Sequence, residues 1–236
     1  MVNAWSKLSE GYAPHAAGKY RRYEVPLLIA LILVLPNFEV PKHLLSLAYA
    51  VVWIVNRAPT RNFGGRWDIW DTTIVIWIAS GYVVAAFAGL HQTEWRGALD
   101  IPRYVLIAWA IKRSGYDETQ LKRLLLAVVI SAVIALAYGF WRLYVTGLGG
   151  ALQLRSVGHV NHSAVFLATS YSVSLAVLLA YWRTFSGSRR MLMALAALAL
   201  SAGVFFTGSR GAVGAVVVTS LLLAVGWWKY STRPIA

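Results

Sequence analysis

The sequence of 236 residues contains no cysteine. Disulfide frameworks, thiol nucleophiles and cysteine-ligated metal sites are therefore excluded for these residues. The first twenty residues also lack the apolar core followed by small residues that marks a cleaved signal peptide. They are polar and basic, so we interpret residues 1–21 as a cytoplasmic N-terminal tail.

Acidic residues are scarce, and they stop halfway along the chain. Nine Asp and Glu stand against 22 Lys and Arg, which gives a formal net charge of +13. The last acidic residue is Glu118, whereas basic residues continue almost to the end of the sequence. An arginine in the second half therefore has no carboxylate near it in sequence. An external anion is its simplest partner, and a phosphate suits a guanidinium because the fork binds two oxygens at once.

Hydrophobic residues make up 58% of the chain and form long runs that are almost free of charge. A soluble domain of this size could not cover so much apolar surface, so the composition predicts an all-α, polytopic transmembrane bundle. In such a protein basic residues collect at cytoplasmic helix ends, which explains the positive charge better than nucleic-acid binding does. The hydrophobic pattern predicts eight spans: 22–37, 42–56, 70–90, 97–111, 121–144, 163–182, 190–206 and 211–229.

Prolines and aspartates mark several of the predicted boundaries. Pro36 and Pro41 flank the connection between the first two spans and predict a tight hairpin, because proline does not continue a helix. Pro102 interrupts the fourth predicted span, which is therefore the weakest of the eight. Asp68 and Asp71 lie at the start of the third span, where the helix dipole favours acidic side chains.

The basic residues also predict the orientation. With the N-terminus in the cytoplasm, only six of the 22 Lys and Arg fall on the outer side, as the positive-inside rule requires. Those six are Lys42, Arg96, Arg103, Arg142, Arg155 and Arg210. Arg155 and Arg210 lie among Gly, Ser and Thr and not among other charges. Because a charge near the hydrocarbon costs roughly 3 to 10 kcal/mol unless it is paired or reaches water, these two arginines are candidate ligand contacts.

The stretch from residue 155 to 164 reads Arg-Ser-Val-Gly-His-Val-Asn-His-Ser-Ala, and we refer to it as the Arg155 motif. It lies in a predicted outer loop, residues 146–162, directly before the sixth span. We expect residues 161–163 to provide the N-cap of that helix. The two histidines are three residues apart, but no carboxylate or third ligand lies near them, so we predict no metal site. The candidate ligand contacts in the motif are Arg155, His159, Asn161 and His162.

A second polar turn, residues 207–212, reads Thr-Gly-Ser-Arg-Gly-Ala and separates the last two predicted spans. We refer to it as the Arg210 turn. Its glycines permit a sharp reversal and a close approach of backbone to ligand. A helix that begins near Gly211 offers free backbone N–H groups to an anion. Ser209 and Arg210 are the candidate contacts, and the alternative is an ordinary turn whose arginine snorkels to lipid headgroups.

A third polar cluster, of mixed sign, lies on the predicted outer side before and within the fourth span. It consists of Glu94, Arg96, Asp100 and Arg103. The favoured interpretation is a set of mutual salt bridges. In the alternative, Arg96 or Arg103 is a further phosphate contact.

The Arg155 motif followed by the Arg210 turn, on successive outer turns of a many-span chain, resembles the bacterial O-antigen ligase and polymerase superfamily. The resemblance implies a GT-C-like fold of about twelve spans and a glycosyltransferase that uses no metal or cofactor. It also implies lipopolysaccharide biosynthesis, in which O-antigen polysaccharide passes from undecaprenyl pyrophosphate to lipid A-core at the periplasmic face of the inner membrane. Arg210 matches the superfamily's arginine that contacts the pyrophosphate, and Arg155 is a second contact.

Members of this superfamily are longer, and a periplasmic loop in their second half carries the histidine taken as the catalytic base. We therefore expect this chain to be the N-terminal part of a longer protein, with its base in the missing loop. Residues 22–145 would then hold the first five spans, and residues 163–236 three more. Two alternatives stay open: an O-antigen polymerase or protein O-oligosaccharyltransferase with the same donor, and a transporter or flippase of an anionic lipid-linked substrate.

Overall fold

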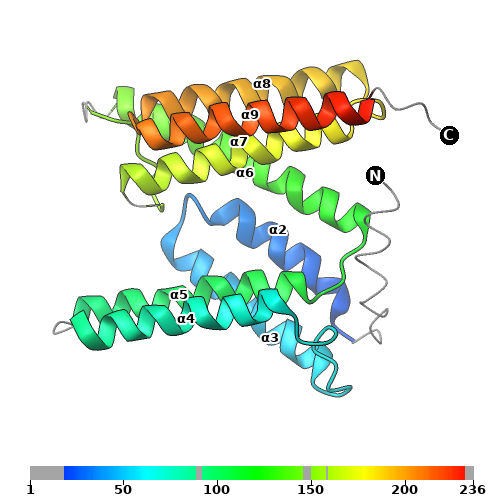
Figure 1. Ribbon diagram of the computed structural model, residues 1–236, viewed down its shortest axis with the longest axis vertical. Helices are drawn as coiled ribbons and strands as arrows, with labels where there is room; N and C mark the ends of the chain where they lie inside the picture. Colours follow the sequence, from blue (N-terminus) through cyan, green and yellow to red (C-terminus); the bar gives the residue numbers. More distant parts are fainter. Residues whose placement is uncertain (1–18, 89–91, 146–149, 158, 232–236) are drawn as a thin grey trace. The chain divides into compact units, whose positions relative to one another are not determined.

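The computed structural model describes residues 19–88, 92–145, 150–157 and 159–231, and all regular structure within these ranges is helical (Figure 1). Each of the eight predicted spans coincides with one α-helix, which confirms the all-α prediction. After the short 3-10 helix η1 (Arg21–Tyr23), the helices are α2 (Glu24–Val34), α3 (Glu39–Arg57), α4 (Ile69–Ala88), α5 (Gln92–Lys112), α6 (Glu118–Val145), α7 (Val160–Ala180), α8 (Gly187–Phe206) and α9 (Arg210–Ser231).

Five of these helices, α4 and α6 to α9, are long and apolar enough to cross a membrane. The chain is therefore a membrane protein with several spanning helices. The other three helices fall short for separate reasons. Helix α2 has only 11 residues, whereas α3 and α5 carry charged side chains within their length.

The proline-based expectations are correct in part. A turn follows α2, but α3 already begins at Glu39, so Pro41 lies in its first turn, where the missing N–H has no partner to lose. The expectation that Pro102 interrupts the fourth span is wrong. Helix α5 runs unbroken through it, since a proline removes the backbone hydrogen bond of one residue only and the turns on both sides keep theirs.

The chain divides into two compact units. Unit 1 contains residues up to Pro26 and from Ser46 to Glu118, and unit 2 contains Leu27–Leu45 and the chain from Thr119 onward. In unit 1, α4 packs along α5, and in unit 2, α7 packs against both α8 and α9.

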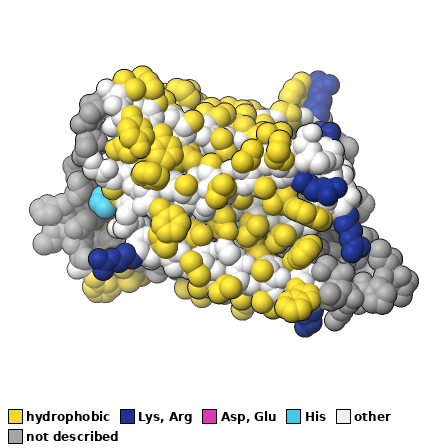
Figure 2. All heavy atoms as spheres, turned by 90° about the horizontal axis from the view of Figure 1, so that it is seen from above, with side chains coloured by type: hydrophobic (Ala, Val, Ile, Leu, Met, Phe, Trp, Pro, Cys, Tyr) yellow, Lys and Arg dark blue, Asp and Glu magenta, His cyan; other side chains and the backbone are white. Residues whose placement is uncertain are grey.

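Unit 2 is held together by small and aliphatic side chains. Leu136 of α6, Leu167 of α7 and Leu200 of α8 are almost completely buried in one apolar cluster. Gly203 has no Cβ, so Leu136 and Leu167 approach the backbone of α8 closely. Figure 2 shows one face of the molecule, where apolar side chains cover the middle and Lys and Arg lie toward the ends. That pattern is typical of a membrane-embedded bundle.

Unit 1 depends instead on buried ions. Asp71, at the start of α4, is fully buried and pairs with Lys112 (3.0 Å) and with Arg113. Asp68 accepts a hydrogen bond from the backbone N–H of Asp71 at 3.1 Å, and Asp71 accepts one from the backbone N–H of Asp68 at 2.8 Å. Both aspartates therefore begin the helix as expected, and both also belong to an ion network with the end of α5. Breaking a buried ion pair of this kind destabilises a protein by about 3–5 kcal/mol.

A second buried ion pair joins the beginning of α2 to the end of α3. Glu24 accepts hydrogen bonds from Arg57 at 2.8 and 3.2 Å and from Asn56 at 2.7 Å. The hydroxyl of Tyr116 also donates to this carboxylate, at 3.2 Å. Both oxygens of Glu24 thus have partners, which is what allows a carboxylate to be fully buried.

We expect Gly64→Ala to destabilise unit 1. Gly64 adopts φ +94°, and a Cβ at this position would overlap the backbone carbonyl of Arg113. Backbone strain and overlap together should lower the unfolding free energy by roughly 3 kcal/mol. Gly208→Ala is the matched control, because Gly208 also has positive φ (+70°) but nothing lies within 4 Å of the position that an added Cβ would take. Thermal unfolding in detergent should show the larger loss for Gly64→Ala, and equal losses would contradict this account.

Candidate functional site

The segment between α6 and α7 carries the first half of the candidate site. Residues 152–156 alternate between buried and exposed: Leu152, Leu154 and Ser156 are buried, and Gln153 and Arg155 are exposed. The two leucines pack against Gly139 of α6, within 3.1 and 3.2 Å of where a Cβ would lie. Because its neighbours on both sides point inward, Arg155 is directed outward.

Backbone hydrogen bonds join this segment to two other helices of unit 2. The N–H of Leu152 donates to the carbonyl of Phe206 at 2.8 Å, at the end of α8. The N–H of Leu154 donates to the buried hydroxyl of Ser163 at 3.0 Å, in the first turn of α7. The Arg155 motif and the Arg210 turn therefore lie at the same end of unit 2, as their predicted sidedness requires. We refer to this end, where α6 and α8 finish and α7 and α9 begin, as the motif end.

Lys42 of α3 holds the same segment from another side. Its ammonium is largely buried and donates to the backbone carbonyl and the hydroxyl of Ser156, each at 3.2 Å. It also pairs with Glu39 at 2.7 Å, and Ser156 donates its hydroxyl to Glu39 at 2.9 Å. The N–H of Ser156 donates to the carbonyl of Pro36 at 3.1 Å. Lys42 is thus a structural cation and is not available to a ligand.

The start of α7 differs from the expected arrangement. His159, and not one of residues 161–163, is the N-cap: its backbone is extended and its Nδ1 accepts from the N–H of Asn161 at 3.3 Å. Ser163 does not cap, because α7 begins three residues before it; its hydroxyl instead accepts from the N–H of Leu154. His159, Asn161 and His162 are all exposed, and the two imidazole centroids lie 6.4 Å apart. Among the described residues no third His, Asp or Glu joins them in a metal-binding group.

The Arg210 turn reverses the chain between α8 and α9. Thr207 caps α8, and its hydroxyl donates to the carbonyl of Val204 at 2.6 Å and accepts from the N–H of Ser209 at 3.3 Å. Gly208 then takes the left-handed conformation, and α9 begins at Arg210. The first N–H groups of a helix have no partner within it. The turn therefore presents these groups together with the exposed side chain of Arg210.

The motif end has an excess of positive charge. Arg155 is exposed and donates to the hydroxyl of Tyr138 at 3.3 Å, and Arg210 makes no hydrogen bond or ion pair with the described residues. Glu39 is the one acidic residue in the sequence of unit 2, and it is paired with Lys42. The amino termini of α7 and α9 add free backbone N–H groups, while the dipoles of these helix ends are offset by the carboxyl ends of α6 and α8, which lie at the same end. This end can therefore bind an anion with several oxygens, such as a phosphate or pyrophosphate.

The remaining predicted contacts lie in unit 1. Arg103 forms a salt bridge with Asp100 at 2.9 Å, and both side chains are about half exposed. This supports the interpretation of mutual salt bridges in that cluster. The side chains of Glu94 and Arg96 lie outside the described part of the structure. An open hollow between α4 and α5, lined by residues such as Gly81, Val84 and Ala98, is apolar and offers no cation to an anion.

The residues that support the site are not apparent from the sequence. The charge pattern identifies Lys42 only as an outer cation, and the capping pattern identifies Ser163 only as an expected cap. Their partners lie elsewhere in the chain: the bond from Lys42 to Ser156 joins residues 114 positions apart. No sequence periodicity or motif predicts a contact between residues so far apart in the chain. The inward and outward alternation of residues 152–156 is the one signal present in the sequence, as Leu-Gln-Leu-Arg-Ser.

Comparison of the chain with models of protein families, with curated proteins and with solved structures finds no match.

We expect Ser163→Ala to destabilise the motif end. The substitution leaves the buried N–H of Leu154 without its acceptor, which should lower the unfolding free energy by about 1–3 kcal/mol. The matched control is Ser201→Ala, because the hydroxyl of Ser201 donates only to a carbonyl of its own helix, that of Leu198. Hydrogen exchange of the Leu154 amide, followed with the thermal unfolding temperature, checks the expectation. Equal protection in both variants would contradict it.

The pair of Glu39 and Lys42 should make the stability of unit 2 depend on pH. Hydrogen bonding from Lys42 holds the pKa of Glu39 below its usual range, although partial burial acts in the opposite direction. A carboxylate with a lowered folded-state pKa stabilises the protein above its unfolded-state pKa, and this stabilisation is lost as the pH falls through the folded-state value. The unfolding temperatures of wild type and Glu39→Gln should therefore differ at neutral pH and converge in acid. A constant difference would contradict the assignment, and Lys42→Met should reduce the pH dependence, because the Ser156 hydroxyl still donates to Glu39.

Proposed function

We propose that the protein transfers a glycan from a polyprenyl-pyrophosphate carrier to an acceptor hydroxyl, and that the motif end binds the pyrophosphate. The observation that carries this proposal is the hydrogen bond from Leu152 to Phe206. It brings together two exposed arginines and two helix amino termini from segments far apart in sequence. The resemblance to O-antigen ligases, based on the Arg155 motif and the Arg210 turn, points to the same donor.

The proposed reaction develops negative charge on the leaving pyrophosphate, which the arginines of the motif end could stabilise. The acceptor oxygen attacks the anomeric carbon of the glycan, the bond from that carbon to the phosphate oxygen breaks, and the pyrophosphate leaves on its lipid. The acceptor's proton passes to a base. Negative charge develops on the leaving group, and preorganised cations and N–H donors lower the barrier by stabilising that charge. In this proposal Arg155, Arg210 and the first turn of α9 supply this stabilisation.

The finer parts of the proposal follow from the resemblance and from the charge pattern. All eight α-helices would contribute to a GT-C-like membrane domain, with the amino terminus in the cytoplasm and the motif end facing the periplasm of a bacterial inner membrane. The acceptor would be lipid A-core, and the reaction would be O-antigen ligation. We assign no catalytic base. His159 is disfavoured because its Nδ1 already accepts the amide N–H of Asn161.

Activity assays with a purified polyprenyl-pyrophosphate-linked glycan test the proposal in detergent, where no membrane gradient exists. Transfer under these conditions would support a transferase. Its absence, together with gradient-driven movement of the lipid-linked glycan in vesicles, would favour a transporter. If the protein requires further chain for activity, the assay uses the longer protein.

We expect Arg210→Ala and Arg155→Ala each to reduce transfer about a hundredfold or more, since each removes a charge from the leaving group. Neither side chain has an ion-pair partner among the described residues, so membrane levels and unfolding temperature should stay unchanged. Arg123→Ala is the matched control, because Arg123 is equally exposed but lies at the opposite end of α6. Wild-type transfer by both site variants would refute the site, and a loss in Arg123→Ala would show that only net charge matters.

A further inference from the structure

We propose that the connection between α3 and α4 is a binding site for the headgroups of anionic phospholipids. We refer to this connection, residues 58–68, as the α3–α4 loop. It belongs to unit 1, and the proposal does not depend on the function proposed for the motif end.

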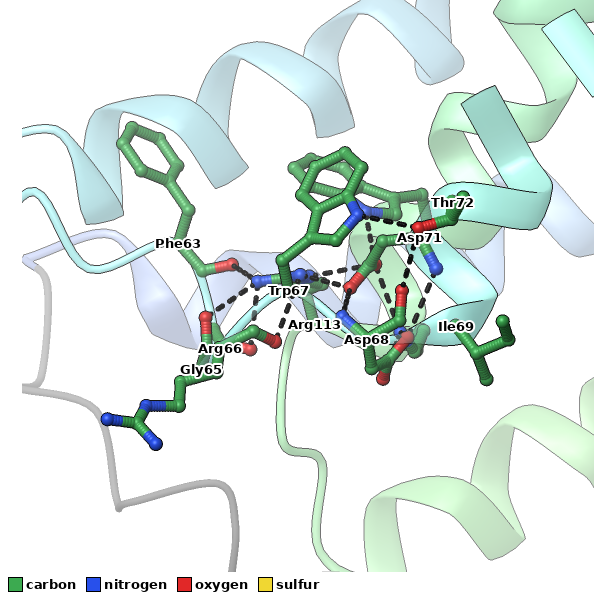
Figure 3. Close-up of polar contacts among 12 residues, drawn as sticks. Phe63, Gly65, Arg66, Trp67, Asp68, Ile69, Asp71, Thr72 and Arg113 are labelled. Carbon is green, nitrogen blue, oxygen red and sulfur yellow. Dashed lines mark hydrogen bonds and ion pairs between the residues drawn. The ribbon is translucent and has the colours of Figure 1, made fainter. Parts of the chain in front are cut away.

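The α3–α4 loop has a fixed shape because Arg113 of α5 binds its backbone. The guanidinium of Arg113, which is almost fully buried, donates to the carbonyls of Gly64 (3.3 Å), Gly65 (2.9 Å) and Arg66 (3.4 Å), and also to Asp71 (Figure 3). All three nitrogens of the Arg113 guanidinium therefore donate hydrogen bonds, to the loop carbonyls or to Asp71. The loop is therefore preorganised, which reduces the conformational entropy lost when a ligand binds.

The carboxylates next to the loop are already neutralised. Asp68 accepts two hydrogen bonds from Lys112, at 2.6 and 2.7 Å, and Asp71 pairs with both Lys112 and Arg113. Two cations thus balance these two anions. The positive charge on the outward side of the loop has no counter-ion within this network.

Arg61 and Arg66 supply that outward charge. Both side chains are exposed, and neither makes a side-chain hydrogen bond or ion pair with the described residues. In Figure 3 the side chain of Arg66 points away from the network around Arg113, although its backbone carbonyl is part of it. The loop thus presents guanidinium groups whose donors are free for phosphate oxygens.

Exposed aromatic and aliphatic side chains lie next to these arginines. Trp67, Ile69 and Trp70 are each more than half exposed, at the point where α4, a membrane-spanning helix, begins. The indole N–H of Trp67 donates to the hydroxyl of Thr72 at 2.9 Å, which holds its ring over the first turn of α4. Tryptophan prefers the boundary between headgroups and acyl chains. The adjoining arginines therefore lie at the depth of lipid phosphates.

The combination of charge and apolar surface favours a lipid over a soluble anion. A free phosphate needs only the guanidinium groups, whereas a phospholipid also covers the exposed Trp67, Ile69 and Trp70 with its glycerol and upper acyl chain. Each basic residue near an anionic membrane surface contributes about 1 kcal/mol, so Arg61 and Arg66 together should favour an anionic over a zwitterionic headgroup on the order of 25-fold.

Native mass spectrometry of the full chain in detergent tests this site with phosphatidylglycerol and phosphatidylcholine of identical acyl chains. Wild type should bind phosphatidylglycerol on the order of 25-fold more tightly. The double variant Arg61→Gln/Arg66→Gln should lose most of this preference, and it should keep its unfolding temperature because neither side chain has a partner among the described residues. The matched control, Arg123→Gln/Arg189→Gln, removes the same charge from exposed positions in unit 2.

Three results would overturn the proposal. An unchanged preference in Arg61→Gln/Arg66→Gln would show that the loop does not select the headgroup. An equal loss in the control would show that net charge alone sets lipid affinity. Displacement of phosphatidylglycerol by millimolar inorganic phosphate would show a site for free phosphate.

A second variant, Trp67→Ser/Trp70→Ser, tests the role of the exposed tryptophans. It should weaken binding of both lipids and leave the preference for phosphatidylglycerol unchanged. A selective loss of that preference would contradict the assigned roles.

Discussion

The alternating burial of residues 152–156 is the constraint on which the motif end depends. Leu152 and Leu154 enter the apolar cluster beside Gly139, and Ser156 is tied to Lys42 and to the turn after α2. A segment fixed at every second residue has little freedom at the residues between. Arg155 is therefore directed outward by its neighbours, and Leu152 carries the hydrogen bond that links this segment to the end of α8.

The two units differ in how many carboxylates they contain and in how their charged side chains are paired. Unit 1 buries two carboxylates and pairs each of them with a basic side chain: Glu24 with Arg57, and Asp71 with Arg113. Unit 2 has a single acidic residue in its sequence, Glu39, and its core consists mainly of small and aliphatic side chains. Arg155 and Arg210 at its motif end consequently have no counter-ion among the described residues, and this is the physical basis for proposing an anionic ligand for them.

Long apolar runs were sufficient to locate the helices, because a run of apolar residues bounded by charge or glycine is a local property of the sequence. The same sequence located the Arg155 motif and the Arg210 turn, and polarity within an apolar chain was the signal. It did not predict that His159 caps α7, or that Ser163 accepts instead from the distant backbone of Leu154. Nor did it predict the role of Arg113, whose partners on the α3–α4 loop are brought to it by the packing of α4 on α5. Long-range pairs of this kind follow from tertiary packing and leave no local pattern.

The most direct test of the central claim is to locate the bound pyrophosphate by photocrosslinking. A polyprenyl pyrophosphate with a photoreactive group beside its phosphates, activated on the purified protein and followed by peptide mapping, reports which residues surround the headgroup. Crosslinks should fall within residues 150–162 and 207–214, with competition by unlabelled polyprenyl pyrophosphate. Crosslinks concentrated instead at the other end of unit 2, around residues 181–190, would contradict the claim that the motif end binds the donor.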